Sequence, residues 1–264
     1  MNHKEVHKRV DEYLKNTLAD NFGYHPIILA FRGSYAHGTY VKDFIDDIDV
    51  IGAGWYNVDY YLGNRTFSKG VTETSGEELD IVYYEIRKFI HLLLGGNPNV
   101  ISMLWLNPEY YLYINPEWEW IVKERELFLS KRILKGLMGY ASNQIERMEK
   151  HKFEGYMSGK RKALVEKFGY DPKMFAHSVR LLRMGQEFAV SGELYPDRRG
   201  RDAEELTEIK QGKYTFEQAK SMGEDLFYQL KSLNILCEIP DKPAISEVNK
   251  KMIKSFLATN LFQK

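Results

Sequence analysis

The sequence lacks the features that define several common protein classes. Its 264 residues include one cysteine, Cys237, which excludes an internal disulfide and a zinc framework built on clustered Cys and His residues. The longest apolar runs, such as residues 89–94, are too short to cross a bilayer, and the charged N-terminus has no apolar signal-peptide region. No Pro-, Gly- or Ser-rich tract indicates disorder. We expect a folded cytoplasmic protein with no membrane partner.

A net charge of either sign is also absent, but the charges are unevenly distributed. The chain has 37 Lys and Arg against 37 Asp and Glu. Residues 131–183 nevertheless hold 13 Lys and Arg against 5 Asp and Glu, so the remainder carries the opposite excess of eight charges. A basic middle segment beside an acidic N-terminal part favours a phosphate-bearing partner, although ordinary solvated helix faces give the same pattern.

Apolar periodicity changes at about residue 130. Before it, one amphipathic helix is followed by three short strand-like runs at residues 26–31, 46–54 and 78–84. An apolar helix then ends at Gly95 and Gly96. After residue 130 helical periodicity dominates. These patterns predict an α/β (α+β) fold, with a small mixed-sheet domain at residues 1–130 and a helical C-terminal domain at residues 131–264.

Acidic residues gather beside a Gly-Ser pair in FRGSYAHGTYVKDFIDDIDVIG, residues 31–52. Asp47 and Asp49 are two apart on a predicted strand, so they point to the same face. Such closely spaced carboxylates repel one another unless a cation lies among them. With Asp80 on another predicted strand they supply the oxygen ligands that Mg²⁺ prefers, and two such ions would promote phosphoryl transfer. Other acids could replace Asp80 as the third ligand, namely Asp59, Glu73, Glu77 and Glu78.

Two further features of the sequence favour phosphate binding. Gly33 permits a close approach of the backbone to a phosphate, and the Ser34 hydroxyl is a donor. His177, Arg180 and Arg183 recur at every third residue along a predicted helix. This cationic row either faces the cleft and holds phosphates, or is a surface row with an Arg183–Glu187 ion pair. The segment GYMSGKR does not match a P-loop, because its spacer is too short and it has Arg where Ser or Thr is needed.

The combination of Gly33-Ser34, Asp47-Ile48-Asp49 and the later Asp80 resembles the signature of the DNA polymerase β-like nucleotidyltransferase superfamily. The segments GSYAHGT, RKFIHLLLGGNPNVISMLW, HSVRLLRMGQEFAVSGELY and DAEELTEIKQGKYTFEQ are similar to its RNA-ligase-associated branch, which has phage and bacterial members. The similarity extends from about residue 28 to about residue 220. Asp46 is a departure, since such proteins often have a small polar residue before the first metal-binding acid.

The resemblance implies that residues 1–130 are the nucleotidyltransferase catalytic domain, and it implies a role for each of these residues. Asp47, Asp49 and Asp80 would be the catalytic, metal-binding residues, holding Mg²⁺ or Mn²⁺. The nucleotide-binding residues would be Gly33, Ser34, His177, Arg180 and Arg183, with an NTP such as ATP as substrate. The enzyme would transfer an NMP from the NTP to an acceptor hydroxyl and release pyrophosphate.

The sequence does not identify the acceptor of the transferred nucleotide. An RNA 3′ end, in tRNA or RNA repair or modification, is the leading expectation. The alternatives are a protein or small-molecule acceptor, or a non-catalytic, antitoxin-like regulatory module that binds nucleotide. The sequence does not indicate an oligomeric state.

Overall fold

A computed structural model describes residues 3–13, 15–16, 24–42, 47–63, 71–75, 79–149, 159–233 and 238–261. Several residues discussed above lie outside these ranges, namely Asp46, Glu77, Glu78 and Cys237.

A mixed five-stranded sheet forms the centre of the first half of the chain. Its strand order is β3-β4-β2-β1-β5, with β2 and β4 parallel and the other neighbours antiparallel. The strands are β1 (Tyr24–Arg32), β2 (Ile48–Tyr56), β3 (Val71–Ser75), β4 (Leu79–Glu85) and β5 (Tyr111–Ile114). The three strands predicted from apolar runs are confirmed as β1, β2 and β4, and they are the three inner strands. The two edge strands were not predicted.

The register of the inner strands brings acidic residues together. The central strand β2 is buried along most of its length between β1 and β4. Asp49 near its start lies opposite Arg32 of β1 and opposite Asp80 of β4. Because neighbours in register on parallel strands point to the same face, the Asp49 and Asp80 side chains share one face at this end of the sheet.

Short helices connect and cover these strands. They are α1 (His3–Tyr13), α3 (Gly33–Ala36), α4 (Val58–Leu62), α5 (Ile86–Leu94), α6 (Pro98–Ile101) and α7 (Pro116–Lys123), with 3₁₀ turns at Ser102–Trp105, Pro108–Tyr110 and Arg125–Phe128. Helix α5 ends at Leu94 and Gly95 caps it, as the Gly95-Gly96 pair predicted. The Asn97 side chain accepts a hydrogen bond from the Asn99 backbone N–H and so caps α6.

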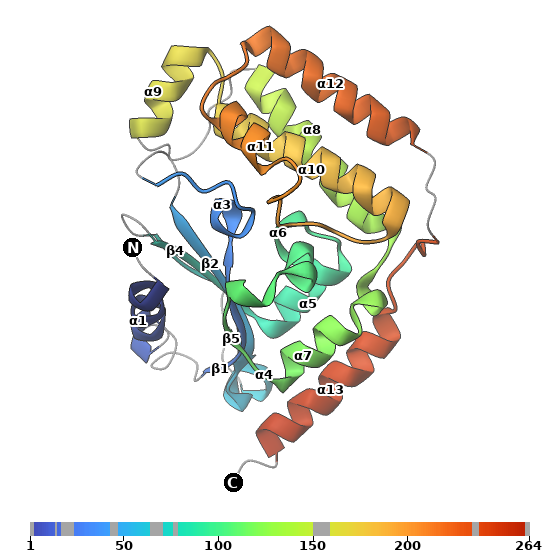
Figure 1. Cartoon of the computed structure of the whole chain (residues 1–264). Coiled ribbons are helices and arrows are strands. Elements are labelled where there is room, and N and C mark those ends of the chain that lie inside the picture. Colours follow the sequence, from blue (N-terminus) through green and yellow to red (C-terminus); the bar gives the residue numbers. More distant parts are fainter. Residues whose placement is uncertain are drawn as a thin grey trace.

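In the second half of the chain, the regular elements among the described residues are all helices, as predicted, and non-helical segments such as 193–202 connect them. Its helices are α8 (Lys131–Glu149), α9 (Gly159–Phe168), α10 (Pro172–Ser191), α11 (Ala203–Lys210), α12 (Phe216–Ser232) and α13 (Ile245–Leu261). Figure 1 shows α8, α10, α11 and α12 grouped above the sheet, while α13 runs back along the first half beside α7. No described helix is both long and apolar enough to span a membrane.

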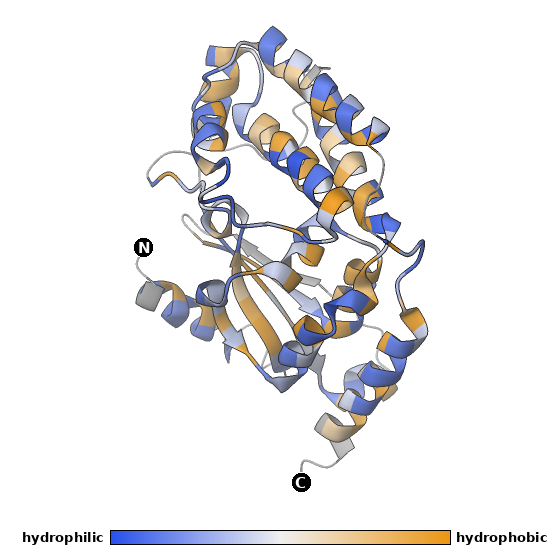
Figure 2. Ribbon diagram, turned by 45° about the vertical axis from the view of Figure 1, so that its right-hand side comes forward, coloured by the Kyte–Doolittle hydropathy of each residue, from blue (hydrophilic) through white to orange (hydrophobic). Residues whose placement is uncertain are grey.

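One main hydrophobic core runs through both halves. It includes strand residues such as Val50 and Ile81 together with Leu137 of α8 and Leu181 of α10. Figure 2 shows the inner strands largely hydrophobic, whereas the upper helices alternate between hydrophobic and hydrophilic residues. A smaller core around Tyr170 and Phe175 joins α10, α11 and α12. The shared main core holds α10 over the end of the sheet that carries Asp49.

Candidate functional site

The Gly-Ser pair forms the start of a single helical turn at the end of β1. Gly33 has φ of 64°, in the left-handed region, and a Cβ atom there would lie 2.2 Å from Oδ2 of Asp49. Only glycine therefore allows this backbone to pass so close to the carboxylate. The His37 backbone N–H donates to the Gly33 carbonyl at 3.1 Å, and the Thr39 N–H donates to the Ser34 carbonyl at 2.9 Å. In Figure 1 this turn, α3, lies at the upper end of the sheet below α10 and α11.

The three predicted acids lie near one another at this end of the sheet. Asp49 is partly buried, Asp80 is its neighbour in register, and Asp47 is exposed just before β2 begins. The pKa of the Asp49 carboxyl is raised above its usual value, chiefly because the group is buried. The positive charges of Arg32 and Lys173 oppose this rise, and the negative charges of Asp80 and Asp47 add to it. The alternative ligand Asp59 lies in α4, beyond the opposite end of β2. Register thus places Asp80, rather than Asp59, beside Asp49.

The donor chemistry of these acids fits a hard divalent cation. Carboxylate oxygens from adjacent strands are the ligands that Mg²⁺ takes in phosphoryl-transfer sites. Within the described residues, however, no three His, Cys, Asp or Glu side chains are close enough together to hold a metal ion. Asp49 is instead balanced by Arg32, whose Nη2 lies 3.7 Å from Asp49 Oδ1. In this structure the three acids are therefore not arranged as a preformed metal site among the described residues.

A cavity of about 220 Å³ lies between the α3 turn and α10. Gly33, Ser34 and Asp49 line it from the sheet side, and His177 and Arg180 line it from α10. Its charged lining contains one carboxylate, that of Asp49, and four cationic side chains, those of Arg32, Lys173, Arg180 and Lys210. A cavity with this balance of charges favours an anionic ligand.

Arg180 is the most deeply buried of the arginines that line the cavity, with 5% of its surface exposed. Its Nη1 lies 3.1 Å from the Met184 sulfur, and its Nη2 lies 3.5 Å from His177 Nδ1. Within the part of the chain that the structure describes, it forms no ion pair with a carboxylate. Burial, followed by the charge of Arg198, lowers the pKa of Arg180 to about 9. The guanidinium is still charged at neutral pH, so a bound anion would supply the missing counter-charge.

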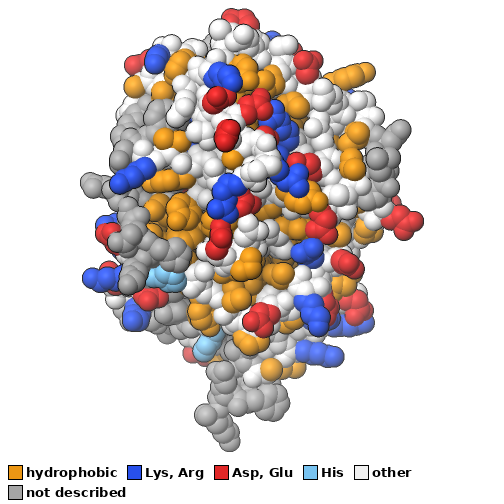
Figure 3. Space-filling model, in the orientation of Figure 1, with side chains coloured by type: hydrophobic (Ala, Val, Ile, Leu, Met, Phe, Trp, Pro, Cys, Tyr) orange, Lys and Arg blue, Asp and Glu red, His pale blue; other side chains and the backbone are white. Residues whose placement is uncertain are grey.

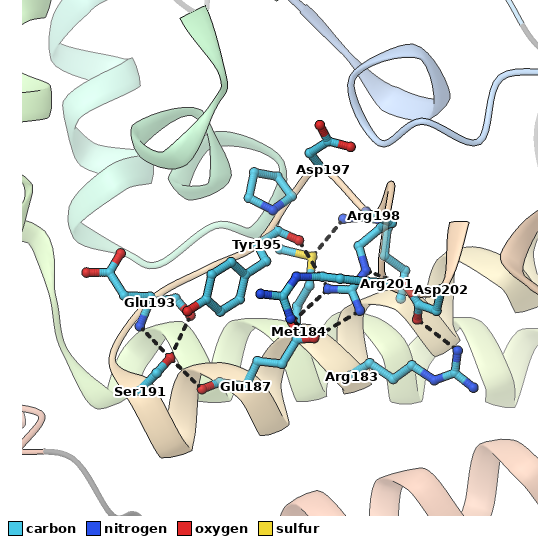
Figure 4. A network of polar contacts seen from close by, with 12 residues as sticks. Arg183, Met184, Glu187, Ser191, Glu193, Tyr195, Asp197, Arg198, Arg201 and Asp202 are labelled. Atoms are coloured by element: carbon cyan, nitrogen blue, oxygen red, sulfur yellow. Dashed lines mark hydrogen bonds and ion pairs between the residues drawn. The ribbon is translucent and has the colours of Figure 1, made fainter. Parts of the chain in front are cut away.

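Arg183 does not line the cavity, contrary to the expectation from its spacing. Its Nη1 lies 2.8 Å from Asp202 Oδ2 and 2.8 Å from Glu205 Oε2. Figure 4 shows it turned toward Asp202. Three residues of an α-helix advance about 300°, so each step of three rotates the side chain by about 60°. Arg183 consequently points about 120° away from His177.

The alternative ion pair between Arg183 and Glu187 is not formed either. Glu187 accepts hydrogen bonds from Nη1 and Nη2 of Arg198, at 2.7 and 3.0 Å, and from Arg201 at 3.3 Å. Arg198 is 2% exposed and also donates from Nε to Asp202 Oδ1 at 2.6 Å. These pairs fix the segment 193–202, which is seen crossing the network in Figure 4.

The segment 193–202 and helix α11 hold the Gly-Ser turn from the helical half. The Arg198 backbone N–H donates to the His37 carbonyl at 3.1 Å, and the His37 ring nitrogen Nδ1 lies 2.8 Å from the Pro196 carbonyl oxygen. The buried Lys210 ammonium donates to the Thr39 carbonyl oxygen. The phosphate-binding turn expected from the sequence is therefore anchored by residues about 160 positions later in the chain.

Three cationic residues of the cavity were missed in the sequence. Lys173 precedes His177 by four residues and Arg180 by seven, which is the spacing of one helix face. That signal was present, and it would have selected Lys173 in place of Arg183. Arg32, the last residue of β1, could have been noticed only as a cation directly before the Gly-Ser pair. Lys210 carries no local signal, because only the tertiary fold brings α11 to the cavity.

Comparisons with known proteins address the identity of the chain. Residues 6–253 match the sequence profile of RlaP, described as the RNA repair pathway DNA polymerase beta family. No curated protein sequence matches the chain. Among solved structures, a nucleotidyltransferase-like protein from Exiguobacterium sibiricum is similar at 10% identity and a TM-score of 0.31, over 85% of this chain and 74% of that one. The family match confirms the resemblance seen in the sequence and covers most of its length: the chain belongs to the RNA repair pathway DNA polymerase beta family of nucleotidyltransferases.

Proposed function

We propose that the cavity binds the triphosphate of an NTP and that the enzyme transfers the NMP to an acceptor hydroxyl. The observation that carries this proposal is Arg180, a buried cation that lacks a carboxylate partner among the described residues and lies across the cavity from Gly33 and Ser34. Charge-assisted hydrogen bonds to phosphate oxygens are stronger than neutral ones, so a triphosphate would compensate the burial of this charge. Lys173 and Arg32 line the same cavity and would add to the attraction.

Each group at the end of the sheet has a proposed role. The α3 backbone and the Ser34 hydroxyl would hold the β- and γ-phosphates, because Gly33 lets them approach closely. Asp47 and Asp49 would hold two divalent cations, Mg²⁺ or Mn²⁺, and Asp80 would hold one of them and accept the proton of the attacking hydroxyl. When bound, these ions would neutralise charge on the phosphates and make the acceptor hydroxyl more acidic. Arg32 would leave Asp49 and turn to the phosphates as the carboxylate binds metal.

The acceptor we propose is an RNA 3′ end, which the family's association with RNA repair supports. The charge distribution limits where such an RNA would bind. Part of the basic excess of residues 131–183 lines the cavity, as Lys173 and Arg180, and Arg183 is neutralised by acids later in the chain. Figure 3 shows acidic and basic side chains interleaved across the upper part of one face. We therefore place the RNA end at the mouth of the cavity rather than along a broad basic surface.

A labelling experiment tests both the reaction and the acceptor. The protein is incubated with each α-labelled NTP, Mg²⁺ or Mn²⁺, and a mixture of total RNA and cell protein, and the label is followed through ribonuclease and protease digestion. Label in RNA 3′ ends, abolished by Asp49→Asn and Asp80→Asn, is the expected result. Label that survives ribonuclease and is released by protease would identify a protein acceptor instead. Tight NTP binding without any transfer would favour the regulatory module.

Salt dependence provides an independent test of the RNA acceptor. Contacts between basic side chains and phosphates release counterions, so RNA binding should weaken steeply as salt is raised. A variant in which Lys160, Arg161 and Lys162 are neutral should have lower RNA affinity and a shallower salt slope. Of the three, only the Lys162 side chain is described, and it is exposed. An RNA affinity that does not change with salt would contradict an RNA acceptor.

A further inference from the structure

His37 is a buried polar side chain on the cavity wall with one of its two ring nitrogens already committed. It follows α3, lines the cavity, and is 9% exposed. Its Nδ1 lies 2.8 Å from the Pro196 carbonyl oxygen. A carbonyl oxygen can only accept a hydrogen bond, so Nδ1 must carry the proton. This contact therefore fixes the tautomer of the ring.

The surroundings of His37 keep the ring neutral. Burial, and then the positive charge of Arg180, lower the pKa of His37 well below its usual value of 6.5, with His177 and Arg198 acting in the same direction. The hydrogen bond to Pro196 raises the pKa, but by less than burial or Arg180 lowers it. A neutral ring with its proton on Nδ1 has a lone pair on Nε2. His37 thus offers the cavity a hydrogen-bond acceptor.

An acceptor in this cavity is unsuited to phosphate. Ionised phosphate oxygens are themselves acceptors, whereas Arg32, Lys173 and Arg180 around the cavity are donors. Within the described residues, the ring of His37 has no hydrogen bond other than the one to Pro196. The Nε2 atom is not among the fully buried, unpartnered side-chain atoms of the described residues, so it is still accessible from the cavity. A ligand that fills the cavity would cover it, and a covered acceptor without a partner costs free energy, so the ligand should bring a donor to Nε2.

The position of His37 identifies which donor of a nucleotide would reach it. Its backbone N–H donates to the Gly33 carbonyl, so the ring lies one helical turn from the proposed phosphate-binding backbone. In an NTP, the hydroxyls of the sugar are the neutral donors nearest to the phosphates. We propose that His37 Nε2 accepts a hydrogen bond from a ribose hydroxyl of the bound NTP and makes the site selective for ribonucleotides. This inference rests on the proposed function of the same cavity.

Equilibrium binding of sugar-modified nucleotides tests the proposal. Calorimetry would compare an NTP with its 2′-deoxy, 3′-deoxy and 2′,3′-dideoxy analogues, and with inorganic triphosphate. The wild-type protein should bind the analogue that lacks the recognised hydroxyl about tenfold or more weakly, because the buried acceptor then has no partner. Equal affinities for all four nucleotides would overturn the inference.

Two variants separate hydrogen bonding to the sugar from anchoring of the loop. In His37→Asn the amide can still donate to Pro196 but has no group at the position of Nε2, so discrimination between sugars should disappear while inorganic triphosphate binds as in wild type. In His37→Gln the amide oxygen can reach the position of Nε2, so part of the discrimination should remain. If His37→Asn discriminates between the sugar analogues as strongly as the wild type does, another residue recognises the sugar hydroxyl. If neither NTP nor inorganic triphosphate binds the wild type, the proposed function itself fails, and the inference fails with it.

Discussion

Gly33 and Asp49 lie so close together that a methyl group on residue 33 would be 2.2 Å from the carboxylate oxygen Oδ2 of Asp49. Gly33 directly follows strand β1, and Asp49 lies near the start of β2, the antiparallel neighbour of β1. The backbone proposed to hold phosphate and Asp49, a proposed metal ligand, therefore occupy one site. A triphosphate and a metal ion bound there would be in direct contact.

Replacing Gly33 by Ala should damage the site more than the fold. The substitution places a Cβ against Asp49 and forces a left-handed conformation, so we expect a loss of stability of about 1–3 kcal/mol and loss of NTP binding. The matched control is Gly139→Ala in the exposed part of α8, where a Cβ would meet no atom within 4 Å. That change should stabilise the protein by about 0.5–1 kcal/mol and leave NTP affinity unchanged. Normal NTP affinity in Gly33→Ala would remove this turn from the site.

Replacing Arg180 by Met should increase stability and reduce function together. Met fills much of the same volume without a buried charge, so the free energy of unfolding should rise by about 1–2 kcal/mol. Affinity for NTP and for inorganic triphosphate should fall roughly 10- to 100-fold, because charge-assisted hydrogen bonds are lost. Chemical denaturation and calorimetry measure the two effects.

Arg183→Met on the same helix is the matched control for Arg180. Its loss leaves Asp202 and Glu205 with one cation fewer, so stability should fall by about 1–2 kcal/mol while NTP affinity stays at the wild-type level. Equal losses of affinity in both variants would show that the direction of Arg183 in the structure is not the direction it takes with ligand.

The contrast between these arginines shows what the sequence could predict. Inner strands such as β2 and β4 were evident because they are apolar runs with burial on one or both faces. The edge strands were not, since β3 is polar and β5 is a four-residue strand that is only partly buried. Spacing placed Arg180 correctly on a helix, but it grouped that residue with Arg183, which points elsewhere. Lys210 and the anchoring of His37 by Pro196 depend on contacts between residues far apart in sequence, and no local pattern encodes them.

The Arg198 network should be the most sensitive ionic feature of the fold. Arg198→Met leaves the partly buried Glu187 and Asp202 without their main counter-charge, and we expect a loss of about 3–5 kcal/mol. It should also speed hydrogen exchange at residues 33–40, because the segment that anchors His37 is released. The control is Arg199→Met, which removes two ion pairs, with Asp197 and Glu109, whose arginine is 50% exposed, and which should cost about 0.5 kcal/mol or less. Equal effects of the two substitutions would contradict an anchoring role for Arg198.

His37 should make stability depend on pH in mildly acidic solution. Its pKa is lowered on folding, so the unfolded chain binds a proton first as the pH falls below about 6.5. The free energy of unfolding should then fall by up to ~1.4 kcal/mol per pH unit until the folded protein also takes up the proton. His37→Asn should remove this part of the pH dependence, as measured by urea denaturation between pH 7.5 and about 5. Parallel curves for the two proteins would mean that His37 is not held neutral by the fold.

The central claim is that the anion cavity and the acids of β2 and β4 form one nucleotide site, and a crystal structure with Mn²⁺ and a non-hydrolysable NTP analogue tests it most directly. The account predicts anomalous density within ~2.1 Å of the carboxylate oxygens of Asp49 and Asp80, triphosphate oxygens at the backbone of Gly33 and Ser34, and Arg180 hydrogen-bonded to a phosphate. Nucleotide bound elsewhere, or Mn²⁺ bound without contact to Asp49, would contradict it.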